Sequence, residues 1–459
     1  MDGVSLKRSM MDLTMKQSVY LPTELVCAII DFAAGLFPEE VYDPSSHKSY
    51  TPSETAFKRC FTSFGLVCRC WHTLVQPYLH RTFAMKFPLD SEIGSEISLE
   101  IYDFPSILRW LDSHSTLVAG SVHHLRVIMT PLSGWSALIL SSGFRPSGLF
   151  QILHRFPKIK SIELVDVSFD DQNVEDSEIT EPEVSLLNLD RFAIYHTAEC
   201  TPTAEDTLEL LSWVGVVDEV FIQTHHSLDW TLGIRHSDGP MVIPRDLRAH
   251  SLVVKSLDLP PPLMRSLHGS QTFTEGTLKM LFIEVDIYTI MNISTLFVPA
   301  APSLVELCFD FSSYCDRATR PFTLILDGRL PMGDFQHLQK LHLKFPLASI
   351  YRAGIYWDIF DTIGAQLPLL TSLQSLTITI IDDEDHADLD LETQLSTFCE
   401  FVVPPLRDMA AELGNSTSLK SFTVILEDYT GRQIDPTGSH RWYIRDSLEA
   451  LGRPEIVHV

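Results

Sequence analysis

Apolar residues recur along this chain of 459 residues in two different rhythms. Up to about residue 83 they return every three or four positions, which is the spacing of one face of an α-helix. From about residue 100 they form a repeated phrase, apolar-x-x-apolar-x-apolar, whose last two apolar positions share one face of a short strand. The sequence therefore predicts an α/β protein, in which an all-α N-terminal module precedes a long series of strands.

The phrase predicts a stacked architecture, because a unit of one strand and one helix cannot bury its apolar faces alone. Helix-like apolar stretches precede several copies, at 105–114, 148–156 and 392–413. We therefore expect residues 84–459 to form an irregular leucine-rich-repeat-like α/β solenoid that ends in a C-terminal capping helix. The alternative is an ordinary α/β domain whose strands begin alike. The copies of the phrase begin at Val122, Ile159, Leu189, Val217, Val254, Leu278, Leu304, Leu338, Leu373 and Leu419.

The N-terminal module divides into helical and polar segments. Residues 1–18 lack an apolar period, so we interpret them as a flexible arm. A first helix is predicted at 20–35, and a second helical region follows at 54–83. Between them lies an insertion at about 36–55 that is rich in Pro, Ser and Tyr. The apolar stripe of the first helix consists of Leu25, Ile29 and Phe32.

The charge balance restricts the partners. The chain has 34 basic and 60 acidic side chains, a net charge of −26, which repels phosphate backbones and anionic lipid surfaces. We therefore expect no nucleic acid and no membrane as partner, and we interpret the acidic stretches 170–183 and 382–392 as solvated loops. The 8 cysteines are scattered and no secretory signal is present, which favours free thiols in the cytoplasm or nucleus.

No catalytic or cofactor motif is recognisable, so we expect no enzyme and no cofactor. Cys68 and Cys70 are about 200° apart on a helix, which prevents joint chelation of a metal; we expect them to be packed thiols and predict no metal site. Phosphate-binding and nucleophile motifs are absent from the sequence. A carboxylate pair needs no local motif, so a cryptic hydrolase stays open as the less favoured alternative.

Residues 19–83 resemble an F-box. The resemblance lies in LPTELVCAII and LVCRCW, and the following QPYLHRTF resembles the segment that leads F-box chains into their next strand. The insertion at 36–55 departs from the usual shorter connection. An F-box followed by irregular leucine-rich-like repeats is similar to the large F-box families of mushroom-forming fungi, which are basidiomycetes. The pattern positions are Leu21, Pro22, Glu24, Leu25, Ile29, Ile30, Leu66, Val67, Cys68, Arg69 and Trp71.

The resemblance implies a substrate-recognition subunit of an SCF (cullin-RING) E3 ubiquitin ligase. The F-box would bind a Skp-type adaptor and through it a cullin, and the solenoid would bind an unknown target protein. A module of roughly 60 residues also has too little core to bury all its apolar side chains, which favours a partner groove. Two alternatives stay open. The helical module could be only the N-terminal cap of the solenoid, or the chain could be a binding scaffold without a ligase role. The implied adaptor-binding residues are Leu21, Pro22, Glu24, Leu25, Ile29, Val67 and Cys68, with Trp71 and Leu74 in the F-box core.

The target surface is predicted from strand alternation. Residues between the core-facing positions point to the opposite face of the sheet, and in the middle strands three of them are large aromatic side chains with carboxylates nearby. Aromatic anchors within a polar rim are typical of protein interfaces. The alternative is that the protein's own loops cover these rings. The predicted target-binding residues are Tyr195, Phe221, Phe282, Glu219, Glu284, Glu306 and Asp310.

Overall fold

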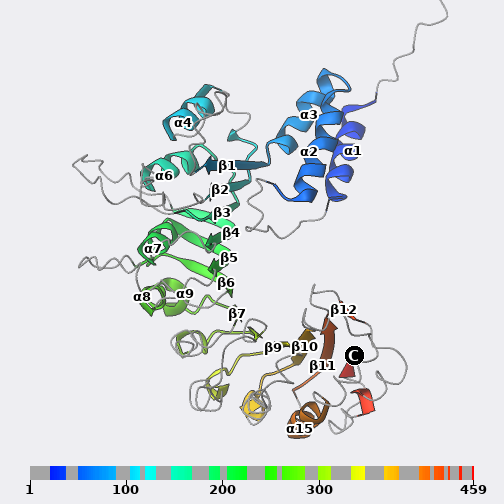
Figure 1. The fold of residues 1–459 in the computed structure, drawn as a ribbon, viewed down its shortest axis with the longest axis vertical. Coiled ribbons are helices and arrows are strands. Elements are labelled where there is room, and N and C mark those ends of the chain that lie inside the picture. The colour runs from blue at the N-terminus through cyan, green and yellow to red at the C-terminus, as the bar shows by residue number, and fades with distance from the viewer. Residues whose placement is uncertain are drawn as a thin grey trace, which may run out of the picture.

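The chain forms a mixed α/β structure that is dominated by one large parallel sheet, as the computed structural model shows (Figure 1). Three helices lie beside its first strand, and the remaining helices lie along one of its faces. The structure describes residues 21–37, 50–88, 104–113, 119–130, 146–167, 186–196, 204–224, 243–255, 261–284, 298–311, 332–346, 366–381, 403–413, 418–427, 433–434, 444–446 and 457–458.

The N-terminal module consists of α1 (Thr23–Gly35), α2 (Pro52–Gly65) and α3 (Arg69–Leu79). The helical region predicted at 54–83 therefore contains two helices, the first of which ends at Gly65. Helix α2 begins with a capping box, in which Thr51 and Glu54 each accept a hydrogen bond from the other's backbone amide. This arrangement satisfies two amides that a helix start otherwise leaves unpaired.

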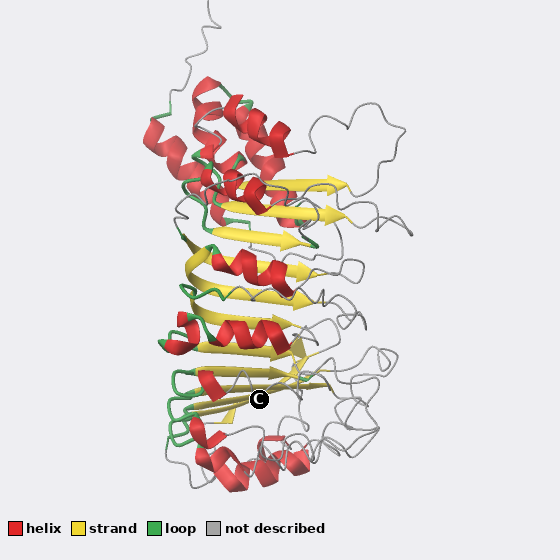
Figure 2. Ribbon diagram, turned by 90° about the vertical axis from the view of Figure 1, so that its left-hand side faces the viewer, coloured by secondary structure: helices red, strands yellow, loops and turns green. Residues whose placement is uncertain are grey.

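In the part of the chain that the structure describes, the sheet has 13 strands, and β1 to β11 follow one another in sequence order, each parallel to the next. The short β12 is antiparallel to β11, and β13 runs parallel to β11. Figure 2 shows the strands stacked one above the next. They are β1 (Thr82–Pro88), β2 (His124–Thr130), β3 (Ser161–Val165), β4 (Leu187–His196), β5 (Val214–Thr224), β6 (Arg248–Lys255), β7 (Met280–Glu284), β8 (Glu306–Asp310), β9 (Lys340–Pro346), β10 (Ser375–Ile381), β11 (Ser421–Glu427), β12 (Gln433–Ile434) and β13 (Val457–His458).

The helices between the strands cover one face of the sheet, in front of the strands in Figure 2. Helices α4 and α6 form within or close to stretches whose apolar spacing predicted them, and α15 forms at the end of the third such stretch. Other connections contain α7 and α8, with 9 and 8 residues, and three shorter helical turns are also described. The elements are α4 (Phe104–Ser113), α6 (Pro146–His154), α7 (Ala204–Ser212), α8 (Pro261–His268), α9 (Gln271–Thr274), η4 (Met332–Asp334), η5 (Leu367–Leu369) and α15 (Val403–Leu413).

The main hydrophobic core lies between the sheet and these helices. Much of it consists of the apolar residues of the repeated phrase. In all copies but one, the last two apolar residues pair in register with those of the neighbouring strand and are buried; Leu125 and Val127 of β2 lie opposite Ile162 and Leu164 of β3. The copy predicted at Val254 is wrong. In β6, Val254 occupies the last apolar position of the phrase instead of the first.

Several predicted segments cannot be compared with the structure. The arm at 1–18 and the acidic stretches at 170–183 and 382–392 lie outside the described residues. The same holds for most of the predicted capping helix, although Ile444 from that segment is fully buried in the main core. Of the predicted insertion, only its two ends are described, and α2 already begins at Pro52.

Candidate functional site

Helix α1 exposes its more apolar side. Leu21, Leu25, Phe32 and Leu36 are 38%, 47%, 71% and 65% exposed, and their spacing places them within one sector of the helix. We call these four side chains the α1 face. The buried side of the helix carries Val26, Ile30 and Ala33 instead. An amphipathic helix that turns its larger apolar side chains toward water is typical of a binding element.

The turn between α2 and α3 adds two exposed apolar side chains. Leu66 and Val67 are 82% and 61% exposed, and Cys68 follows them as the exposed residue at the start of α3. Together with the α1 face, they make up half of the exposed large apolar side chains in the part of the chain that the structure describes. Exposed apolar side chains are therefore concentrated on the N-terminal module.

The core of the module is small and aromatic. Phe61 is fully buried, and its ring lies 4.2 Å from that of Phe57 and 5.4 Å from that of Tyr78. The Tyr78 hydroxyl donates a hydrogen bond to Asp31 on α1, and burial together with this carboxylate raises the pKa of Tyr78 to about 12. Few side chains are fully buried here, so the module cannot cover the α1 face from within.

The sequence-predicted adaptor residues are largely accessible. Leu21, Pro22, Glu24, Leu25, Val67 and Cys68 are exposed, and Ile29 is half-buried. The predicted core residues Trp71 and Leu74 are half-buried against the module core. Whether these residues bind an adaptor stays a prediction.

One expectation about the side chains of the module is wrong. Cys68 and Cys70 are exposed and not packed in a core; Cys68 is the N-cap residue of α3, and Cys70 lies in its first turn. The predicted binding set also lacked Leu36 and Leu66. The signal that could have found Leu36 is its helical spacing from Phe32.

The second candidate region is the sheet face opposite the main core, which we call the open face. The target prediction named Tyr195 and Phe221 as accessible anchors on it, and this accessibility is wrong, since the two residues are only 1% and 5% exposed. They pack with Ile128, Val165 and Ala193 in a second apolar cluster. The alternative named the protein's own loops as the cover, but the described side chains that pack on these two rings belong to strands.

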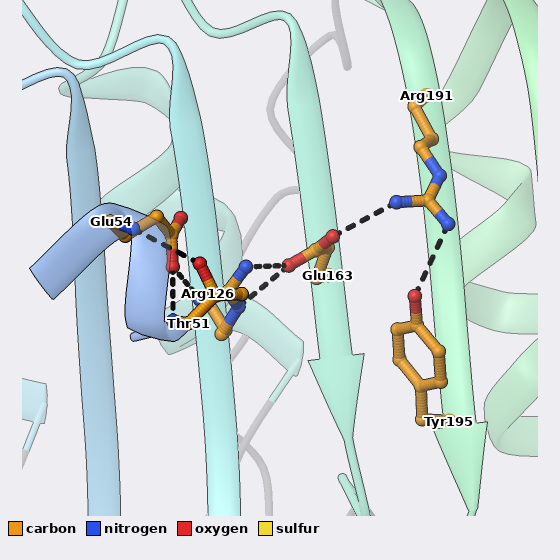
Figure 3. Close-up of polar contacts among 6 residues, drawn as sticks. All are labelled: Thr51, Glu54, Arg126, Glu163, Arg191 and Tyr195. Carbon is orange, nitrogen blue, oxygen red and sulfur yellow. Dashed lines mark hydrogen bonds and ion pairs between the residues drawn. The ribbon is translucent and has the colours of Figure 1, made fainter. Parts of the chain in front are cut away.

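A chain of ion pairs crosses the open face beside this cluster (Figure 3). Arg126 on β2 contacts Glu54 of α2 at 2.9 Å and Glu163 of β3 at 2.6 Å. Glu163 also contacts Arg191 on β4 at 3.0 Å, and Arg191 reaches Glu219 on β5 at 2.8 Å. The predicted target residue Glu219 is therefore already engaged in an ion pair within the chain.

The electrostatics of this network agree with its geometry. Burial opposes the charge on Arg126, but Glu163 and Glu54 outweigh it and raise the pKa of the guanidinium. Arg191 donates to the Tyr195 hydroxyl at 3.2 Å, and burial followed by the nearby Glu163 raises the pKa of Tyr195 to about 12. The sequence-based prediction did not include this network. A signal was present, because the aligned phrases place Arg126 and Glu163 side by side with opposite charges.

The open face is more accessible at β7 than at β4 and β5. Met280 is 38% exposed, Phe282 is half-buried, and the Lys255 ammonium lies 5.9 Å from the Phe282 ring centroid. Of the predicted carboxylates here, Glu284 and Glu306 are half-buried, whereas Asp310 is only 8% exposed. Glu306 pairs with Lys340 at 2.9 Å.

One thiol on this face lies beside an imidazole, because Cys308 and His342 are register partners on β8 and β9. Burial and then Asp310 raise the pKa of the Cys308 thiol, which disfavours the thiolate that nucleophilic chemistry needs. His342 instead contacts Thr379 at 2.8 Å between the ring Nε2 and the hydroxyl oxygen. In the described parts of the chain no cluster of three or more His, Cys, Asp or Glu side chains could hold a metal ion.

Comparison with known proteins adds no relative. No model of a protein family matches the sequence, and a search of curated proteins also finds no match. Among the helices that the structure describes, none combines the length and the apolar character needed to cross a membrane.

Proposed function

We propose that the chain is the substrate-recognition subunit of an SCF (cullin-RING) ubiquitin ligase that works in the cytoplasm or nucleus. Helices α1–α3 are its F-box-like module, and they bind a Skp-type adaptor. Strands β1 to β11 with their helices are a leucine-rich-repeat-like solenoid that holds the target protein. The strict sequence order of the parallel strands supports the second assignment, since each unit then contacts only its neighbours.

The observation that carries the proposal is the α1 face together with Leu66 and Val67. Burying apolar surface contributes about 25 cal/mol for each Å² removed from water, so large exposed side chains on one small module favour a partner with an apolar groove. The F-box resemblance lies in LPTELVCAII, which contains Leu21 and Leu25, and in LVCRCW, which contains Leu66 and Val67. Surface exposure and motif therefore agree at these four positions.

The target surface is best assigned to the more accessible part of the open face. Phe282 stays in the proposed set, and Met280 joins it as the exposed neighbour two residues earlier on β7. Tyr195 and Phe221 leave the set as direct contacts because they are buried. Lys255 beside Phe282 provides a positive charge at this position.

The adaptor assignment is tested by co-expressing the full chain with a Skp-type adaptor and purifying on one tag. The variant Leu25→Ser with Phe32→Ser should lose most of the adaptor, because both side chains belong to the α1 face. Leu369→Ser is the matched control, since Leu369 is 56% exposed and lies far along the sheet; it should retain the adaptor. If the wild-type chain captures no adaptor, a binding scaffold without a ligase role is the better assignment.

A further inference from the structure

The N-terminal module and the sheet have separate hydrophobic cores. Among the residues that the structure describes, the module cluster around Phe61 and Val75 shares no buried side chain with the main core or with the cluster on the open face. The two parts are joined by the short chain from α3 to β1, where the Arg81 carbonyl accepts hydrogen bonds from the amides of His123 and His124. Without a shared apolar core, the angle between the parts depends on polar contacts.

The first turn of α2 supplies such contacts. Thr51 and Ser53 in this turn are 6% and 8% exposed, although most polar residues of a surface helix face water. One carboxylate oxygen of Glu54 accepts from the Thr51 amide at 2.7 Å and from the Arg126 guanidinium at 2.9 Å. The same oxygen therefore closes the start of the helix and connects it to β2 (Figure 3).

The contact continues into the sheet. Arg126 also holds Glu163 through its Nε and Nη2 atoms, each 2.6 Å from the same carboxylate oxygen. The side chains of Arg126 and Glu163 are 6% and 11% exposed, so water screens this pair weakly. Removing one member of a buried pair leaves a charge without its partner and is strongly destabilising, so the pair resists separation.

We propose that Glu54, Arg126 and Glu163 form a lock that fixes the N-terminal module against the open face of the sheet. The lock sets the direction in which the α1 face points relative to strands β6 to β9. This positioning role is independent of which partner binds either surface. The proposal rests on two observations. Polar contacts join two separate hydrophobic cores, and one Glu54 oxygen accepts hydrogen bonds from both the Thr51 amide and Arg126.

Hydrogen–deuterium exchange and small-angle X-ray scattering on the full chain test the lock. Arg126→Met removes both ion pairs but leaves the capping box intact. It should speed amide exchange in α2 and the start of β2 by about tenfold or more, and it should lengthen the particle, while exchange in β7 to β11 stays unchanged. Glu54→Gln keeps an oxygen for the Thr51 amide and removes only the charge, so it should have a smaller effect on the same segments.

Lys160→Met is the matched control, because Lys160 pairs with Asp190 at 3.2 Å on the same sheet, but the two side chains are 57% and 62% exposed. It should change neither measurement. If Arg126→Met does not fold, the double variant Arg126→Met with Glu163→Gln is used instead. It removes one charge of each sign, and Arg191 still pairs with Glu219. The lock is overturned if exchange in α2 is unchanged, or if exchange rises equally along the whole sheet.

Discussion

The rings of Tyr195 and Phe221 pack against one another on the open face, with their centroids 5.1 Å apart and a tilt of 42° between the planes. The Arg191 guanidinium lies 5.2 Å from the centroid of the Phe221 ring and donates to the Tyr195 hydroxyl. The aromatic pair is thus packed among apolar side chains and also contacts a guanidinium of the ion-pair network. It works as a second core of the fold.

This second core predicts different consequences for two phenylalanines on the same face. Phe221→Ala should lower the free energy of unfolding by about 3 to 5 kcal/mol, because it opens a cavity in a closed cluster. Phe282→Ala should cost clearly less, since Phe282 is half-buried. Urea unfolding of both variants measures the difference. Equal losses would show that Phe282 is as enclosed as Phe221.

The module core supports a second comparison. Phe61 is fully buried between two aromatic rings, whereas Trp71 is half-buried and contacts Phe64 with a centroid separation of 5.6 Å. Phe61→Ala should therefore destabilise by about 3 to 5 kcal/mol, the range for a large core truncation, and Trp71→Ala by less. Peptide-resolved hydrogen exchange in α1 to α3 distinguishes them. A larger effect of Trp71→Ala would contradict this order.

The sequence predicted the strands well because their signal is local. In each correct copy of the phrase, two large apolar residues two positions apart face the main core, and this spacing is readable without any partner strand. The copy at Val254 failed because Ala249 stands where the other copies have a large residue. A small buried side chain such as Ala249 gives a weak hydrophobic signal. The prediction therefore placed the start of the phrase at the larger Val254.

The open face was harder to predict. The alternation of side chains along a strand indicates which residues point away from the main core, but not which groups cover them. Phe221 and Phe282 occupy the same register position of their strands, yet only Phe221 is buried. The pairing of Glu54 with Arg126 joins residues 72 positions apart, and no local pattern encodes it. The α1 face was visible in the sequence, but its stripe also fitted a core, and only the packing of Val26 and Ile30 decides between the two.

His196 at the end of β4 makes the stability of the fold dependent on pH. The side chain is 5% exposed, and burial lowers its pKa from 6.5 to about 3. His124 on β2 shifts in the same direction, to about 4, again mainly through burial. Between pH 6.5 and these lower values the unfolded chain takes up protons that the folded chain does not. The free energy of unfolding therefore falls as the pH falls through this window.

His196→Asn tests this linkage, because asparagine is polar and does not titrate. At pH 5 the imidazole should cost the wild-type fold about 2 kcal/mol relative to pH 7, since one pKa unit corresponds to about 1.36 kcal/mol. The variant should lack this part of the loss, which urea unfolding at both pH values measures. His250→Asn, which removes an exposed imidazole and keeps the buried one, should retain the wild-type loss. An equal loss in His196→Asn and wild type would mean that His196 is already protonated in the fold.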